Sequence, residues 1–281
     1  MSRIEQAIRG LRHWLSPTPM PDKRYPAPRA GTKLKKHDVA VIWLHWFNAM
    51  VWVVELVTGA ALIFSAKYQL APAFFQRMVE GIFGSRANLL NFHISVGVLW
   101  ILGMLPYVLF CYRRYVKGFL QNVSLDHDDV LWLYRKTLSL VGRDVVLPPQ
   151  GSYNAGQKAF GILGILASTL IMATGLIMTF HPLPQIWVSW SIVVHFLAVG
   201  MVFAGLFVHI YMAAFMPNER PAFFSMFSGQ VDAQYAYHHH YKWYQQVLHG
   251  CHEAQTQCSE ETKDAAKAPE AQSEDANETQ G

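Results

Sequence analysis

The chain has 281 residues, of which 52% are hydrophobic and only 15% are charged. A soluble protein usually carries about 25% charged residues, so this composition excludes an ordinary water-soluble domain. The net charge is +4, and the Lys and Arg residues gather mainly outside the apolar stretches. That distribution indicates membrane topology and gives no reason to expect nucleic-acid binding.

Residues 1–37 are expected to form a cytoplasmic extension, because they hold nine of the Lys and Arg residues. Apolar side chains recur in this segment at Ile4, Ile8, Leu11 and Leu15, with basic ones beside them. This spacing is typical of an amphipathic helix that lies on a membrane surface or against a partner; a disordered leader is the alternative. The apolar core of a cleavable signal peptide does not follow the first charges.

Four stretches are long and apolar enough to cross a bilayer, at about residues 38–64, 89–111, 158–180 and 188–215. The sequence therefore predicts an all-α membrane protein in which residues 38–216 form a four-transmembrane-helix bundle. The loop between the second and third spans holds six Lys and Arg residues, against three in the first loop and none in the last. By the positive-inside rule, both termini and this middle loop are expected to be cytoplasmic.

Four histidines lie well inside these spans. His45 is in the first, His93 in the second, and His195 and His209 are both in the fourth. His195 and His209 are fourteen residues apart, which places them on nearly the same helix face with a rise of about 21 Å between them. The direction of each span then gives the depths. His45 and His209 lie at the inner depth, whereas His93 and His195 lie at the outer depth.

Paired imidazoles that face each other inside a helix bundle are the usual axial ligands of a b-type haem. We therefore predict two b-type haems, with His45 and His209 on the inner iron and His93 and His195 on the outer iron. The alternative is four core histidines that hydrogen-bond to neighbouring helices. A zinc or di-iron site is disfavoured because no cysteine and too few carboxylates accompany these histidines. A covalent c-type haem is excluded because no CxxCH motif is present.

Glycines and one carboxylate accompany the histidines. Gly59, Gly97 and Gly175 lie where a missing side chain would give a macrocycle room, although ordinary helix packing explains each glycine equally well. Glu55 lies near the middle of the first span. An intramembrane carboxylate predicts a functional role, such as carrying a proton or contacting the edge of a haem. A protonated structural side chain is the alternative.

The third span begins in the motif YNAGQK, Tyr153–Lys158. Together with HW at His45, FHxxxG around His93 and Hx13HIYMA from His195, this motif resembles the gamma subunit of respiratory formate dehydrogenases, a dihaem cytochrome b. The resemblance covers about residues 33–245 and includes an HHYKWY segment near its end. The histidine pattern alone is shared with the b-type cytochromes of nickel-iron hydrogenases, so YNAGQK is what narrows the resemblance.

The resemblance implies a menaquinone or ubiquinone site on the cytoplasmic side, where Asn154, Gly156 and Gln157 would contact the quinone beside the inner haem. Amide groups at the start of a helix suit this role, because they donate hydrogen bonds and the helix dipole favours a developing negative charge. The alternative for Asn154 is a simple helix cap. The resemblance also implies two partner subunits in the bacterial inner membrane complex: an iron–sulfur beta subunit and a molybdenum- or tungsten-containing alpha subunit.

Residues 217–250 are expected to form a cytoplasmic C-terminal segment, and residues 251–281 a disordered acidic tail. The chain has no molybdopterin, flavin or iron–sulfur motif, so we expect no catalytic residues for oxidising a substrate. The predicted function is to pass electrons from an outer iron–sulfur subunit through two haems to a quinone. One alternative is the cytochrome b of a nickel-iron hydrogenase or a thiosulfate-type reductase. Another is a haem-free membrane anchor or proton-relay transporter.

Overall fold

The computed structural model describes residue 5, residues 27–63 and residues 71–251. The predicted amphipathic helix at Ile4 to Leu15 and the predicted acidic tail lie outside the described residues, apart from Glu5 and Cys251. These two predictions therefore stay predictions.

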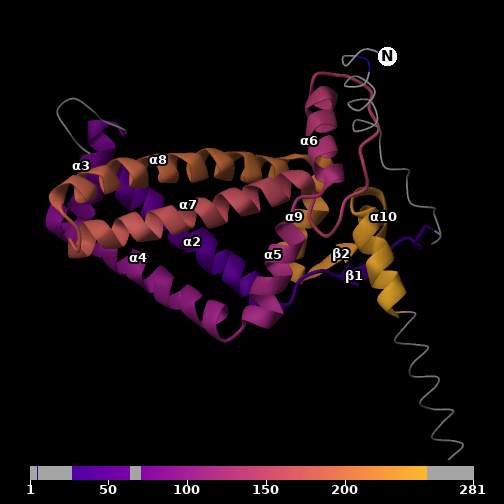
Figure 1. Cartoon of the computed structure of the whole chain (residues 1–281), viewed down its shortest axis with the longest axis horizontal. Coiled ribbons are helices and arrows are strands. Elements are labelled where there is room, and N and C mark those ends of the chain that lie inside the picture. The colour runs from indigo at the N-terminus through magenta and orange to yellow at the C-terminus, as the bar shows by residue number, and fades with distance from the viewer. Residues whose placement is uncertain (1–4, 6–26, 64–70, 252–281) are drawn as a thin grey trace, which may run out of the picture.

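Four long helices form the body of the protein (Figure 1). They are α2 (Val39–Leu62), α4 (Arg86–Leu109), α7 (Ala155–Phe180) and α8 (Gln185–Ile210). Helix α8 continues as a π-helical turn, η2 (Tyr211–Phe215). All four helices are long and apolar enough to cross a membrane. The prediction of four spans is confirmed, and each described span begins or ends within three residues of its predicted limit.

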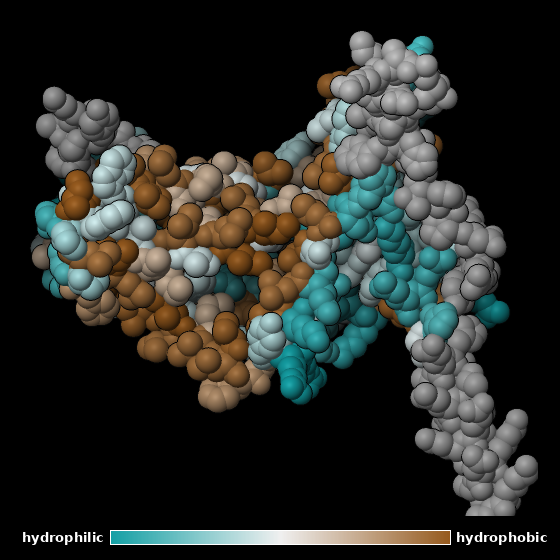
Figure 2. Space-filling model, viewed as in Figure 1, coloured by the Kyte–Doolittle hydropathy of each residue, from teal (hydrophilic) through white to brown (hydrophobic). Residues whose placement is uncertain are grey.

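The bundle buries small side chains and leaves large apolar ones outside. Ala167, Ala198 and Val202 are buried where α7 packs along α8, with Trp52 and Ile171 against them. Large side chains such as Leu166, Leu197 and Phe207 stay more than half exposed, and a broad hydrophobic band covers the four helices in Figure 2. Helices in lipid associate through small residues and present large apolar ones to the acyl chains, so this arrangement fits a membrane.

One end of the bundle, here called the α3 end, is closed by α3 (Ala73–Phe83) (Figure 1). Val79 of α3 packs against Ala61 and Leu89, and the Gln76 side chain donates to the carbonyl of Ile63 at the end of α2. The sequence analysis did not predict this short helix. Helix α3 covers the end of the bundle that lies nearest to His93.

The opposite end, here called the sheet end, carries a two-stranded antiparallel sheet that the all-α prediction missed. Strand β1 (Lys33–Lys35) pairs with β2 (Gln230–Asp232), with Leu34 opposite Val231. Gly229 has a positive φ of 73°, and a Cβ there would lie 2.8 Å from the carbonyl oxygen of His37. Only glycine fits this position, and its carbonyl accepts hydrogen bonds from the amides of Lys36 and His37. The sheet therefore ties the segment before α2 to the segment after α8.

Several short helices surround the sheet end (Figure 1). In chain order they are η1 (Tyr112–Val116), α5 (Lys117–Val123), α6 (His127–Leu140), η3 (Pro217–Glu219), α9 (Arg220–Ser228) and α10 (Ala233–His239). Residues 241–251 are also helical, and Tyr241 and Tyr244 pack with Ala233 and Ala236 into a small buried core. The predicted domain limits at residues 37 and 216 stay predictions, and the sheet joins the segments on either side of them.

Candidate functional site

Two histidines near the α3 end are oriented by threonines from neighbouring helices. His93 Nδ1 lies 2.8 Å from Thr58 Oγ1, and His195 Nδ1 lies 3.0 Å from Thr174 Oγ1. Each threonine hydroxyl donates its own hydrogen to the carbonyl four residues earlier, at 2.8 Å and 2.6 Å respectively. Each hydroxyl oxygen is therefore left to accept a hydrogen bond from the ring. This fixes both imidazoles with the proton on Nδ1, so that Nε2 keeps a free lone pair for a metal.

A glycine follows each of these threonines and gives the histidine ring its place. A Cβ on Gly59 would lie 3.3 Å from His93 Cε1, and one on Gly175 would lie 3.6 Å from His195 Cε1. From the sequence, these glycines were open to two interpretations, room for a macrocycle or ordinary helix packing; the described contacts are with the imidazoles. The sequence analysis did not single out the threonines, although the Thr-Gly pair in the middle of two spans was a readable signal.

His93 has a second polar neighbour, the carboxylate of Glu55. Glu55 Oε2 lies 2.5 Å from His93 Nδ1, and both side chains are about four-fifths buried, with 19% and 21% exposed. The other carboxylate oxygen, Oε1, is buried and has no hydrogen-bond partner among the described residues. It faces Gly97, where a Cβ would lie 3.7 Å away. Gly97 therefore gives room to the carboxylate.

His45 and His209 face each other near the sheet end. Their ring centroids are 6.4 Å apart and the rings are tilted by 55°. Two metal–nitrogen bonds of about 2 Å, together with the half-widths of two imidazoles, add up to about 6 Å. The gap is therefore the size that one ion between two axial ligands needs. His45 Nδ1 is buried without a hydrogen-bond partner in the described part of the chain, and His209 stacks on Phe160, with centroids 4.7 Å apart.

The structure thus brings His45 and His209 together near the sheet end and places His93 and His195 near the α3 end. Within the described residues, no group of three or more His, Cys, Asp or Glu side chains could enclose a metal ion. The four imidazoles instead form two pairs. A haem needs only two protein ligands on its iron, so these donor sets fit it better than an ion held by protein alone.

The three predicted quinone residues lie at the start of α7. Asn154 Oδ1 accepts from the amide of Gln157 at 2.9 Å, and Gln157 Oε1 accepts from the amide of Asn154 at 3.0 Å. This is a reciprocal capping box, so Asn154 caps α7, and its quinone role stays a prediction. The Asn154 side-chain amide makes no hydrogen bond to a described residue. A Cβ on Gly156 would lie 3.4 Å from Asn154 Oδ1.

Asn154 also lines a cavity of about 260 Å³ at the sheet end. Met212 and Met216, which follow His209 along the chain, line the same cavity. Its other walls come from α6, from the segment before α7 and from α10, through Trp132, Pro149, Tyr237 and His238 among others. A larger, more open hollow of about 770 Å³ is lined by Trp43, Trp46 and Arg114. Neither cavity was predicted from the sequence.

A family model of prokaryotic cytochrome b561 matches residues 36–229, well over half of the chain and all four long helices. This chain belongs to the prokaryotic cytochrome b561 family. The family implies b-type haem, which agrees with the paired imidazoles. With its four membrane-crossing helices, this cytochrome is a multi-pass protein of the bacterial inner membrane.

Known relatives of this cytochrome are subunits of formate dehydrogenases. The cytochrome b556 subunit of formate dehydrogenase from Haemophilus influenzae is 23% identical over 223 residues, which cover 77% of this chain and 84% of that protein. The cytochrome b556(fdo) subunit from Escherichia coli K12 is 27% identical over 207 residues, covering 72% of this chain and 88% of that protein. The nitrate-inducible cytochrome b556(Fdn) subunit of the same organism is 26% identical over 147 residues, covering 50% and 63%.

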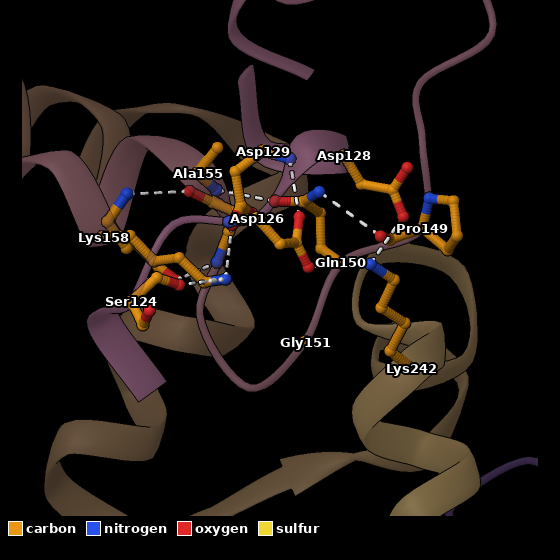
Figure 3. A network of polar contacts seen from close by, with 12 residues as sticks. Ser124, Asp126, Asp128, Asp129, Pro149, Gln150, Gly151, Ala155, Lys158 and Lys242 are labelled. Atoms are coloured by element: carbon orange, nitrogen blue, oxygen red, sulfur yellow. Dashed lines mark hydrogen bonds and ion pairs between the residues drawn. The ribbon is translucent and has the colours of Figure 1, made fainter. Parts of the chain in front are cut away.

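The start of α7 in this cytochrome is anchored by buried polar contacts (Figure 3). Lys158 Nζ lies 2.6 Å from Asp129 Oδ2, and both side chains are almost fully buried. Asp129 also accepts from the amide of Asp126, as part of the capping box of α6. Gln150 Oε1 accepts from the amide of Ala155 at 2.6 Å. These contacts fix the cavity wall that carries Asn154.

Buried titratable groups also contact the segment that precedes α7. His240 Nδ1 lies 2.8 Å from the carbonyl of Gly151, its Nε2 lies 3.3 Å from the Tyr235 hydroxyl, and that hydroxyl donates to Glu219 at 2.8 Å. Burial and the nearby charge of Lys36 lower the pKa of His240 to about 3. Burial together with Glu219 raises the pKa of Tyr235 far above its usual value. His240 and Tyr235 are therefore neutral at pH 7.

Proposed function

We propose that this chain is the membrane cytochrome b subunit of a respiratory formate dehydrogenase, with two b-type haems and a quinone site. The observation that carries this proposal is the presence of two separate imidazole pairs on the family bundle. In one pair, threonines hold both rings with Nε2 free, and in the other the rings lie at the spacing of two axial ligands. The names and coverage of the relatives support formate as the substrate of the whole complex.

The sheet end is assigned to the cytoplasm. Basic residues cluster there, with Lys33, Lys35 and Lys36 before α2 and Arg113, Arg114 and Lys117 after α4. By the positive-inside rule this end stays inside, so both termini are cytoplasmic and the α3 end faces outward. His93 and His195 then hold the outer haem, and His45 and His209 hold the inner haem.

A bound haem supplies reversible one-electron transfer at its iron. His195 and His209 lie about 21 Å apart along α8, and each would hold one haem together with its partner histidine. Haems at these two sites would carry electrons from the His93 and His195 pair toward the His45 and His209 pair. Because the chain has no substrate-oxidising motif of its own, an iron–sulfur beta subunit would deliver them from a molybdenum or tungsten alpha subunit.

The quinone is placed in the cavity lined by Asn154 and Met212, one helical turn beyond His209. The side-chain oxygen of Asn154 is used for capping, so the hydrogens on its Nδ2 are the groups available for a quinone carbonyl. The amides of Ala155 and Gln157 already donate to Gln150 and Asn154, so Gly156 is the backbone donor proposed for the quinone at this helix start, where the dipole favours a developing negative charge. Gln157 would act by holding Asn154 in place. Protons would be taken from the cytoplasm, and reduction would thereby generate membrane potential.

Haem content tests the cytochrome assignment most directly. The purified complex should show two low-spin b haems in reduced-minus-oxidised spectra and in a haem count. His93→Ala should remove the outer haem and His209→Ala the inner one, each leaving about half of the signal. Zero haem in the wild type, or variants that keep both signals, would refute it and favour a haem-free anchor or proton-relay transporter.

The quinone site is tested with two substitutions of one residue. Asn154→Asp keeps an oxygen that can cap α7 but removes the Nδ2 donor, whereas Asn154→Ala removes both. We expect both variants to lose quinone reduction by at least tenfold while formate still reduces both haems. If Asn154→Asp turns over like the wild type, the quinone site lies elsewhere, with the hollow beside Trp46 as the next candidate.

The identity of the partner is tested by co-purification. An iron–sulfur subunit together with a molybdenum or tungsten subunit is the expected outcome. Recovery of a nickel-iron hydrogenase large subunit or a thiosulfate-type reductase instead would keep the cytochrome and replace formate as the donor.

A further inference from the structure

Three of the four paired histidines lack an acidic partner among the described residues, and His93 has one. His195 is held by Thr174 and by the backbone of Ile171, His209 stacks on Phe160, and Nδ1 of His45 has no described partner. His93 Nδ1 faces the Thr58 hydroxyl and, at 2.5 Å, the Glu55 carboxylate. A carboxylate inside a span is costly. Thr58 already gives His93 the threonine contact that Thr174 gives His195. Orientation of the ring therefore does not explain why Glu55 is there.

We propose that Glu55 is a positioning residue that lowers the reduction potential of the outer haem below that of the inner haem. The inference rests on the proposed function, because it takes His93 as an axial ligand of the outer iron. Glu55 touches no reacting atom and acts through the His93 ring. The class of interaction is a carboxylate–histidine–metal triad.

The direction of the effect follows from charge. A carboxylate that accepts the Nδ1 proton of a metal-bound imidazole makes the ring a stronger electron donor to the iron. The oxidised iron carries one more positive charge than the reduced iron, so both the donor strength and the negative charge of Glu55 favour the oxidised state. Both side chains are only about one-fifth exposed, so water screens this interaction weakly. The outer haem is therefore harder to reduce.

The described groups at the inner pair give no matching effect. In that part of the structure no carboxylate contacts His45 or His209. With both haems bound, a lower potential at the His93 site would favour electron transfer toward the inner pair. Glu55 thus gives the chain a direction of electron transfer that the two histidine pairs alone do not supply.

The packing around Glu55 supports a fixed role. Its Oε2 is held at the His93 ring, and its Oε1 lies over Gly97 of α4. A side chain at position 97 would narrow this space, so helix α4 provides both the histidine and the room for the carboxylate. Glu55 is also three residues before Thr58 on α2, which puts both acceptors on one helix face.

The test is a redox titration of both haems in the purified complex, followed by absorbance and by the low-spin ferric EPR signals. Glu55→Gln keeps the size of the side chain and removes the charge. We expect the reduction equilibrium of the outer haem to shift at least tenfold toward the reduced form, about 59 mV for a one-electron couple. The inner haem should stay within twofold. Glu55→Asp, which restores a carboxylate, should recover part of the shift.

Thr58→Val is the matched control, because it removes the neutral partner of His93 and keeps the charged one. Its outer haem should stay within threefold of the wild type, and this holds as a test even if Glu55→Gln fails to retain the outer haem. An unchanged outer potential in Glu55→Gln, an equal shift of both haems, or a tenfold rise in Thr58→Val would each overturn the inference. Absence of haem from the wild-type complex would refute the proposed function instead.

Discussion

The two histidine pairs of this cytochrome are held in different ways. Near the α3 end, His93 and His195 are each fixed by a threonine of the neighbouring helix, and a glycine beside the threonine makes room for the ring. Near the sheet end, His45 and His209 have no such pair of polar partners among the described residues. His209 stacks on Phe160 instead, and Trp46, next to His45, donates its indole hydrogen to the carbonyl of Met226.

The difference shows which parts of the chain each site depends on. The outer site is built from side chains of the membrane helices themselves. The inner site depends on segments outside the bundle, because the sheet, α9 and the anchored start of α7 position the ends of the helices that carry it. Substitutions that destabilise these peripheral segments should therefore cause loss of the inner haem while the outer haem stays bound.

Among the substitutions that test this comparison, Lys158→Met should have the largest effect on stability. This change leaves the buried carboxylate of Asp129 without its cation, which lies 2.6 Å away in the wild type. Breaking a buried pair from one side typically costs about 3–5 kcal/mol. We expect a loss of that order in the free energy of unfolding, measured by denaturant titration in detergent, with the inner haem signal lost before the outer one.

Lys242→Met is the matched control for this prediction. Its ammonium group pairs with Asp126 and Asp128, but its side chain is 30% exposed, against 9% for Lys158, so a smaller loss than in Lys158→Met is expected. Equal losses in the two lysine variants, or simultaneous loss of both haems, would contradict the division of the molecule into two differently supported ends.

Acid should also act on the sheet end first. The pKa of His240 is lowered from 6.5 to about 3 by burial and by Lys36, so the unfolded chain takes up a proton at higher pH than the folded one. Stability is then fully present above about pH 6.5 and falls as the pH drops toward 3. The expected loss is about 1–2 kcal/mol between pH 7 and pH 5, measured as the thermal midpoint of the inner haem signal.

His240→Asn keeps a donor near the Gly151 carbonyl and cannot titrate, so it should flatten this dependence. Part of the slope will remain, because burial and Lys36 also lower the pKa of His37, to about 4. The outer haem signal serves as the internal reference. If the variant shows the full wild-type slope, His240 is not the group responsible.

The sequence was sufficient for the features that depend on local helix geometry. Length and hydropathy located the four spans, and helical periodicity along α8 placed His195 and His209 at different depths. The capping box was also readable, because Asn154 and Gln157 have the spacing of a helix start. Each of these inferences needs only residues within one element.

Features that depend on contacts between elements could not be predicted in the same way. Which face of α2 meets His93 is set by helix packing, so Thr58 was missed and Glu55 was left with several possible roles. Strands β1 and β2 are three residues long and come from opposite ends of the chain, so neither has a detectable alternating pattern. For Gly229, only the contact with His37 shows why the residue must be glycine.

The smallest test compares two glycines that serve the same purpose at the outer site. A Cβ on Gly175 would lie 3.6 Å from His195, an ordinary contact, whereas one on Gly59 would lie 3.3 Å from His93. Gly175→Ala should therefore stabilise the protein by about 0.5–1 kcal/mol through reduced backbone entropy. Gly59→Ala should lose that gain, because the His93 ring must move by a few tenths of an ångström and overpacking costs about 1–3 kcal/mol.

The EPR signal of the outer haem separates this local strain from a general effect on the helices. Because the His93 ring is held by Thr58 and Glu55 on one side, it cannot rotate away from a new methyl group without lengthening those contacts. Gly59→Ala should thus shift the outer signal while Gly175→Ala leaves it unchanged, and neither should alter the inner signal. If the two variants behave identically, the histidine rings are packed less tightly against the Thr-Gly pairs than these contacts indicate.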